Sequence, residues 1–204
     1  MSLTEAQSSP QEVELKLAIA SDSARDAAGR EVGRARARSL ETIYYDTPRR
    51  RLHSAGYSLR LRRDGEHWSQ SVKASSGFAR YEHEKPLRGG LPDFSLLEGT
   101  PLASLVGQDG GLSPVFVTRV TRRSKKHAMD NGSIEMSFDQ GEVVASDRSW
   151  PILELELELK DGKPQALFDT GRRLAEGEAF VPDFMSTLIT VPPLLPNSAA
   201  KLLF

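Results

Sequence analysis

Two stretches of this chain carry a carboxylate at every second residue. Run 11–17 reads QEVELKL, and run 151–160 reads PILELELELK. Alternation with a period of two places the acidic side chains of a β-strand on one face and the apolar side chains on the other. If the two strands pair, four or five carboxylates converge into an oxygen-rich group that suits Mg²⁺ or Mn²⁺. The carboxylates are those of Glu12, Glu14, Glu154, Glu156 and Glu158.

Basic side chains occupy the charged faces of other alternating segments, namely Lys16, Arg60, Arg62 and Lys73. Arginine can bind a phosphate group through two parallel hydrogen bonds. Basic side chains that bind phosphate, beside carboxylates that bind a metal ion, are typical of a phosphoryl-transfer site. The sequence has no GxxxxGK[ST] motif, so a nucleotide site of the phosphate-loop type is not supported,. The alternative is a solvated charged surface with weak cross-strand ion pairs.

Composition limits the classes of function. The chain has 204 residues, a net charge of −1 and no cysteine, so disulfides and thiolate chemistry are excluded and no global field favours nucleic acid or membranes,. No apolar run approaches the roughly 20 residues of a membrane span, and the first residues lack a signal-peptide pattern. We therefore expect a cytoplasmic protein with a disordered lead-in at 1–10 and a single domain at 11–204.

Several short alternating segments predict an antiparallel sheet of eight or nine strands. Asp64–Gly65 and Asn131–Gly132 are strong hairpin signals, whereas Gln140–Gly141 predicts a break between two strands,. We expect helices within 21–37, 94–106 and 165–176, the last with Leu167, Phe168, Gly171 and Leu174 on one side. The fold class is α+β, mainly antiparallel β. We predict a closed eight-stranded barrel with a charged interior and helices packed outside.

The order of these motifs resembles the CYTH superfamily of triphosphate tunnel metalloenzymes, in its bacterial inorganic triphosphatase branch. The resemblance covers residues 12 to about 201. It is carried by EVELK at 12–16, YYDT at 44–47, LRLRR at 59–63, Lys73, RYEHE at 80–84, SFDQGEV at 137–143 and ELELELK at 154–160. It implies a hydrophilic tunnel inside an eight-stranded barrel.

The resemblance also implies roles for individual residues. The metal ligands would be Glu12, Glu14, Glu154 and Glu156, with Glu158 extending the ladder. The phosphate chain would be held by Lys16, Arg60, Arg62, Lys73 and an arginine of the strand after Pro114, for which Arg122 fits best and Arg119 and Arg123 compete. Catalysis would involve Lys16, together with Asp139 and Glu82 or Glu84, which orient the cations or a water molecule. Lys201 resembles a lysine that closes one mouth of the tunnel.

The expected function is metal-dependent hydrolysis of inorganic tripolyphosphate or a similar short chain. Class IV adenylate cyclase and thiamine triphosphatase are the enzyme alternatives, and a polyphosphate-binding module is the alternative without catalysis. The expected partner is a small polyanion, either tripolyphosphate or a nucleoside triphosphate, with neither nucleic acid nor membrane. The branch also suggests a C-terminal CHAD domain in a longer protein.

Overall fold

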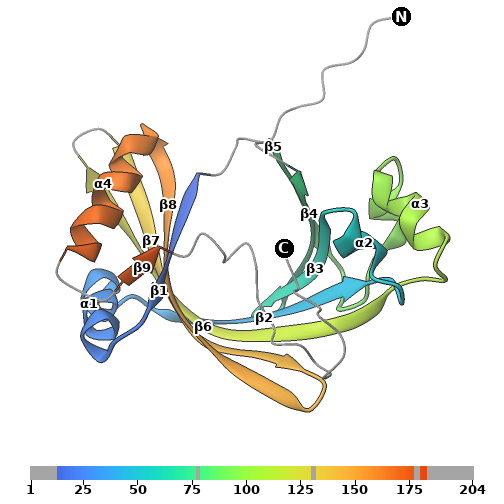
Figure 1. The fold of residues 1–204 in the computed structure, drawn as a ribbon, viewed down its shortest axis with the longest axis horizontal. Helices are drawn as coiled ribbons and strands as arrows, with labels where there is room; N and C mark the ends of the chain where they lie inside the picture. Colours follow the sequence, from blue (N-terminus) through green and yellow to red (C-terminus); the bar gives the residue numbers. More distant parts are fainter. Residues whose placement is uncertain (1–12, 77–78, 130–131, 177–179, 183–204) are drawn as a thin grey trace, which may run out of the picture.

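Nine strands form one antiparallel sheet in a computed structural model that describes residues 13–76, 79–129, 132–176 and 180–182. The strands are β1 (Glu14–Ile19), β2 (Ala37–Asp46), β3 (Tyr57–Asp64), β4 (His67–Ser76), β5 (Ala79–Leu87), β6 (Ser113–Met129), β7 (Gly132–Ala145), β8 (Arg148–Gly162) and β9 (Phe180–Pro182). Their order in the sheet is β5-β4-β3-β2-β6-β7-β8-β1-β9. The sheet curves into an arch with a concave inner face and a convex outer face (Figure 1).

Helices cover the two ends of the outer face (Figure 1). They are α1 (Asp22–Val32), α2 (Arg51–Ser54), α3 (Pro101–Gly107) and α4 (Pro164–Ala175), with the 3-10 helix η1 (Phe94–Leu97). The side chain of Ser21 caps α1 by accepting a hydrogen bond from the backbone N–H of Ala24 at 3.1 Å,.

The leucines of the long acidic strand point to the outer face. Leu155 and Leu157 are fully buried in a cluster that also contains Leu167 of α4 and Ala28 of α1. Burying these side chains provides the main stabilisation at this end. Because side chains alternate along a strand, the glutamates of β8 must point to the inner face. The predicted separation of a charged inner face from an apolar outer face is therefore confirmed for the leucine–glutamate run of β8, while a smaller apolar cluster that includes Phe116 and Val143 lies on the inner face farther along the sheet.

A second apolar cluster lies at the other end of the arch. Leu59 and Val72 of β3 and β4 pack there against Leu52 of α2 and Leu102 of α3. The opposite face of β3 consequently presents its arginines to the concavity. The two apolar clusters thus fix which charged side chains face each other across the arch.

The predicted barrel is not closed. No described ladder joins β5 to β1, and the edge of β1 from Leu17 to Ile19 pairs instead with the short strand β9. That pairing occupies backbone groups that a closing strand would need. The sheet is mainly antiparallel, as predicted, but it is an open arch with an additional edge strand.

Several local predictions also differ from the structure. The short helix α2 lies outside the three predicted helical regions, and the helix predicted at 94–106 is divided into η1 and α3. Phe168 is 52% exposed rather than packed with its neighbours on α4. Both hairpin predictions are confirmed, by the β3–β4 register and by the pairing of Met129 with Gly132.

The predicted break at Gln140–Gly141 is wrong, because β7 continues through it. Gly141 is required there for a different reason. A Cβ atom at this position would collide with the backbone carbonyl of Arg119 on the adjacent strand β6,. Within the described ranges, no helix combines the length and apolar character needed to cross a membrane.

Candidate functional site

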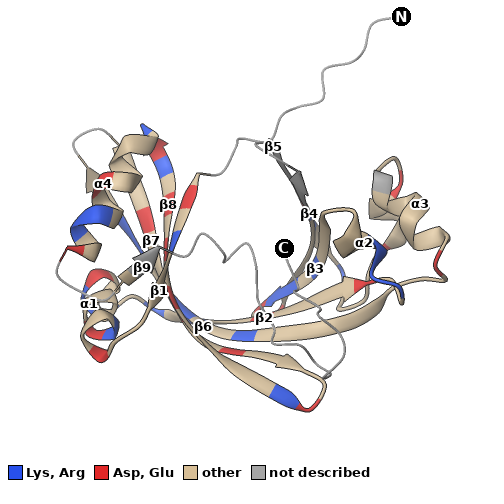
Figure 2. Cartoon of the chain, viewed as in Figure 1, with Lys and Arg blue, Asp and Glu red and all other residues tan. Residues whose placement is uncertain are grey.

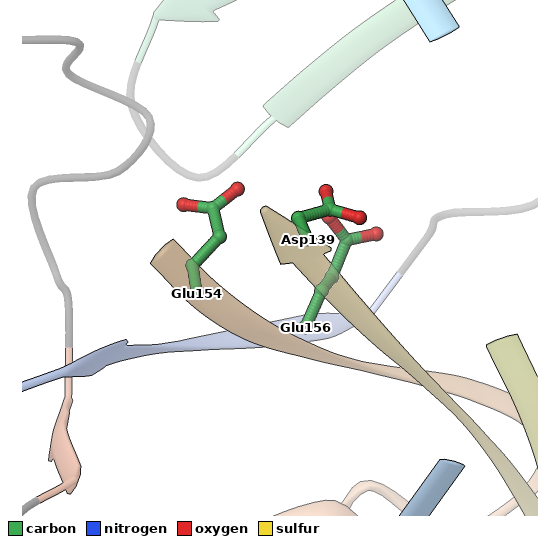
Figure 3. A group of neighbouring side chains, drawn as sticks. All are labelled: Asp139, Glu154 and Glu156. Carbon is green, nitrogen blue, oxygen red and sulfur yellow. The ribbon is translucent and has the colours of Figure 1, made fainter. Parts of the chain in front are cut away.

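Three carboxylates gather on the inner face, where β7 and β8 pair. Asp139 lies directly opposite Glu154 in the ladder, and Glu156 follows two residues along the same face. One carboxylate oxygen from each residue lies within 4.8 Å of the others. Figure 3 shows the three side chains pointing to the same side of the two strands. The register of β7 and β8 therefore determines the positions of all three carboxylates.

Arg122 of β6 binds this acidic group from the side. Its Nε and Nη2 atoms donate to the two carboxylate oxygens of Asp139 at 2.8 and 2.6 Å, a bidentate pair,. Nη2 also donates to Glu156 at 3.2 Å. Burial opposes the charge on Arg122, but the hydrogen bonds to Asp139 and the charge of Glu156 raise its pKa. Asp139 therefore orients a permanently charged guanidinium.

Lys16 of β1 approaches from the other side. It lies opposite Glu156 in the ladder, with its Nζ atom 3.3 Å from a carboxylate oxygen of that residue. Burial opposes the ammonium charge, but Glu156 and Glu154 raise the pKa of Lys16 above the ordinary lysine value. Burial likewise opposes the charge on Glu156, but Lys16 and Arg122 outweigh it and lower the pKa of this carboxyl to about 2. Glu156 is therefore ionised at neutral pH.

Glu154 differs from its two neighbours. Within the described part of the chain it has neither a hydrogen-bond partner nor an ion pair within 4.0 Å. Burial raises its pKa, and the nearby charges of Asp139 and Glu156 add to this effect, while Lys16 and Arg122 only partly offset it. A carboxylate crowded by like charge on a half-buried surface is relieved by a divalent cation. The acidic group therefore fits a metal ion with Glu154 as its most available ligand.

Basic residues occupy the facing part of the arch, on β3 (Figure 2). Arg62 donates from Nε to the hydroxyl of Thr42 at 3.3 Å. The adjacent charge of Arg60 and burial lower the pKa of the Arg62 guanidinium, while Tyr44 acts in the opposite direction. The charge of Arg62 in turn helps to lower the pKa of Glu156. The arginines and the acidic group therefore interact electrostatically across the inner face.

Tyr44 lies between the two charged sets and is not among the site residues predicted from the sequence. Its ring stacks on Phe116, with ring centroids 4.3 Å apart. Burial opposes ionisation of the phenol, but Arg60 and Arg62 outweigh it and lower the pKa of Tyr44, with Lys16 contributing as well. Tyr44 lies opposite Arg60 in the β2–β3 ladder. The sequence does not reveal this pairing, because the register of the two strands is known only from the structure.

The structure distinguishes the three competing arginines of β6. Arg122 reaches the acidic group, whereas Arg119 and Arg123 lie on the outer face. Arg119 is 54% exposed and pairs with Glu41 at 3.1 Å. Arg123 lies over the ring of Phe138, 5.3 Å from its centroid.

Other predicted site residues lie farther along the inner face. Glu158 binds Lys160 at 2.6 Å and lies opposite Glu14 in the ladder, so these two glutamates are beside the acidic group rather than in it. Lys73 of β4 lies opposite Ser58 of β3. Glu84 is exposed on edge strand β5, where it accepts a hydrogen bond from Ser71 at 2.7 Å.

Three predictions concern parts that the structure does not describe. Glu12 and Lys201 lie outside the described residues, and so does the predicted lead-in at 1–10. Glu82 belongs to β5 and lies opposite Lys73 in the ladder, but its side chain is not among those described. Its predicted role stays a prediction.

Comparisons with known proteins agree with this architecture. The chain is 30% identical over 137 residues to an inorganic triphosphatase of Haemophilus influenzae, a match covering 64% of this chain and 38% of that relative. The chain thus spans well under half the length of the relative it matches.

Solved structures show a similar fold. A candidate adenylate cyclase from Bacillus halodurans superposes with a TM-score of 0.54 at 12% identity, covering 80% of this chain and 87% of that chain. The Hippeastrum protein HpAC1, described as having a dominant triphosphatase activity, gives 0.53 at 18% identity, covering 80% and 85%. Residues 10–180 match the CYTH domain family. This chain therefore belongs to the CYTH domain family.

Proposed function

We propose that this chain hydrolyses inorganic tripolyphosphate, or a similar short triphosphate, with the help of Mg²⁺ or Mn²⁺. The observation that carries the proposal is the arrangement of the inner face. An acidic group, in which Asp139 and Glu156 are buried and Glu154 is half-buried, faces the arginines of β3 in a CYTH domain. The resemblance to an inorganic triphosphatase supports the same substrate class.

The metal would be held by the acidic group, with Glu154 as the first ligand. Glu12, Glu14 and Glu158 remain proposed additional ligands on the same ladder. When bound, the ion would neutralise charge on the phosphate oxygens and lower the pKa of a coordinated water. Hard divalent ions prefer such carboxylate oxygens, which is why Mg²⁺ and Mn²⁺ are proposed.

The phosphate chain would be bound by Arg60, Arg62 and Lys16. The like charges of the two arginines repel each other, so a polyanion between them would lower their electrostatic energy,. Lys16 would contact the chain from the acidic side, since its ammonium is fixed by Glu156. Proposed additional contacts are Lys73, Arg122 and Lys201.

The remaining side chains would orient these groups. Asp139 fixes both nitrogens of Arg122 that face it, which would aim the guanidinium at charge developing in the transition state,. Glu156 is ionised and accepts from Lys16 and Arg122, so it would keep both cations in place. For Glu82 and Glu84, we retain the proposal that one of them orients a lysine, an arginine or a water.

A substrate panel tests the proposal. The protein is incubated with Mg²⁺ or Mn²⁺ and with tripolyphosphate, ATP, thiamine triphosphate or long-chain polyphosphate, and phosphate release and cyclic AMP are measured. We expect phosphate release from tripolyphosphate that disappears when a chelator removes the metal. Reactions without metal and reactions without protein are the controls.

Other outcomes would assign a different function. Cyclic AMP formed from ATP would identify an adenylate cyclase, and preferential cleavage of thiamine triphosphate would identify that triphosphatase. Saturable binding of polyphosphate without turnover of any substrate would identify a binding module. Any of these results would overturn the tripolyphosphatase assignment.

A further inference from the structure

An open depression of about 560 Å³ lies on the outer face, between α1 and strands β6 and β7. Its lining is rich in guanidinium groups and includes two glycines and one carboxylate. The lining residues that matter here are Arg25, Asp26, Arg30, Arg123, Phe138 and Gln140. None of these residues belongs to the acidic group or to the arginines of β3.

Arg123 is held in a fixed position at the base of the depression. Its guanidinium lies over the ring of Phe138, 5.3 Å from the centroid, and Nη1 donates to the backbone carbonyl of Gly33 at 3.4 Å. Nη2 lies 4.0 Å from the position that a Cβ atom would take on Gly29. Among the described residues, no carboxylate lies within ion-pair distance of Arg123. Its charge is therefore positioned but not neutralised by a direct contact.

The arginines of α1 add to this positive charge. Arg25 is 50% exposed, and its pairing with the fully exposed Asp22 is long, at 3.8 Å. Arg30 lies in the last turn of α1, where the helix dipole favours a cation,. The lining thus contains three guanidiniums and one carboxylate, that of Asp26, and Arg30 has a further interaction within the chain. The depression has a local excess of positive charge although the whole chain has a net charge of −1.

This depression is separated from the inner face by the thickness of one sheet. Arg122 and Arg123 are consecutive residues of β6, and they lie opposite Asp139 and Phe138 in the ladder. Because consecutive side chains of a strand point to opposite faces, Arg122 reaches the acidic group and Arg123 reaches the depression. A ligand at Arg123 would therefore not contact the inner site.

We propose that the outer depression is a second anion site, which binds a phosphate-bearing anion. Guanidinium groups bind phosphate oxygens through paired hydrogen bonds, and the three arginines can do so from two elements, α1 and β6. The side-chain amide of Gln140 offers a further donor. The depression exceeds the size of a carboxylate, and its charge excess matches an anion with more than one negative charge. Orthophosphate, pyrophosphate and a longer phosphate chain share this chemistry.

Backbone amide shifts in ¹⁵N-labelled protein test the proposal. The protein used carries Arg60→Gln and Arg62→Gln, two substitutions that weaken the inner site. Orthophosphate, pyrophosphate and tripolyphosphate are added to it in separate titrations, with a chelator present and at constant ionic strength. We expect the amides of Gly29 and Gly33 to shift saturably. Equal affinities would identify a single phosphoryl group as the ligand, and affinity that increases with chain length would identify a chain. Both results support the site, and neither requires hydrolysis.

Three further variants on the same background locate the binding. Arg123→Gln removes a charge-assisted contact and should weaken binding by about tenfold or more. The double variant Arg25→Gln/Arg30→Gln changes two exposed side chains and should weaken it without affecting the core. Arg172→Gln, on exposed α4 beside Asp169, is the matched control and should leave binding unchanged. Shifts that chloride reproduces, or that all three variants retain, would overturn the proposal.

Discussion

The acidic and basic parts of the inner face differ in how their charges are balanced. In the acidic part, Glu156 has two direct partners of opposite sign, Lys16 at 3.3 Å and Arg122 at 3.2 Å. On β3, the neighbouring charge of Arg60 is the largest cause that lowers the pKa of Arg62. We expect the first arrangement to persist without a ligand, whereas the proposed anion would relieve the repulsion in the second. The comparison therefore predicts that substitutions around Glu156 affect mainly folding and that substitutions on β3 affect mainly binding.

Glu154 provides the sharpest test, because it belongs to the acidic part yet has no direct partner among the described residues. Glu154→Gln should lower turnover of tripolyphosphate by about 10³-fold, since it removes the proposed first metal ligand. Stability should stay the same or rise, because the change also removes a buried charge that its neighbours repel. Steady-state kinetics and urea unfolding measure the two effects. The exposed Glu66→Gln is the control, and full activity of Glu154→Gln would refute the ligand assignment.

Glu156 should behave differently from Glu154, although it lies only two residues away. Glu156→Gln leaves Lys16 and Arg122 without their shared carboxylate, so we expect a loss of about 3 kcal/mol in the free energy of unfolding. Urea unfolding of the two glutamine variants, side by side, measures the difference. Equal stabilities of the two variants would contradict the stabilising role of Glu156.

The pH dependence of stability gives a second view of Glu156. Its pKa is lowered from 4.5 to about 2 in the folded protein, so its stabilising contribution is present above pH 4.5. The contribution is lost as the pH falls towards 2, because protonation then favours the unfolded chain. Glu156→Gln should therefore flatten this part of the acid unfolding curve in metal-free protein, and an unchanged curve would argue against the lowered pKa.

The basic part should affect binding more than folding. Arg62→Gln should raise KM for tripolyphosphate by about ten- to a hundredfold, the range expected for losing a charged hydrogen bond. Stability should change little, since the substitution also relieves repulsion from Arg60. Arg63→Gln is a matched control on the next residue, because Arg63 lies on the outer face near Glu41. A large fall in the melting temperature of Arg62→Gln would mean that this arginine stabilises the fold.

The smallest expected effect concerns two adjacent tyrosines. Despite burial, the neighbouring arginines lower the pKa of Tyr44, whereas burial raises the pKa of Tyr45. An absorbance titration should show that Tyr44→Phe removes a phenol ionising below pH 10 and that Tyr45→Phe removes one ionising above it. The same early transition in both variants would show that the cations do not reach Tyr44 as described.

The period of two predicted the faces correctly, because which side chains share a face depends only on local backbone geometry. Leu155 and Glu156 therefore lie on the predicted sides of β8. Closure of the barrel could not be predicted in the same way, since it depends on which strand pairs with the edge of β1. The partner is β9, a strand of 3 residues, which is too short to show an alternating pattern.

The assembly of the candidate site shows the same limit. The alternating charges marked Glu154 and Arg122, but only the ladder register places Asp139 between them. Gly141 was interpreted as a break because a glycine usually weakens a strand. Here its missing side chain allows β6 to approach closely, which is a tertiary reason that no local pattern contains.

The pairing of β1 with β8 has a consequence for biosynthesis. The two strands are separated by roughly 140 residues of chain, so this contact closes a very long loop and is expected to form slowly,. On the ribosome, β1 emerges first and must wait for nearly the whole domain before it can pair. We therefore expect Lys16 to meet Glu156 late in folding, so that the leucines of β1 stay without their native cover until most of the domain has been made.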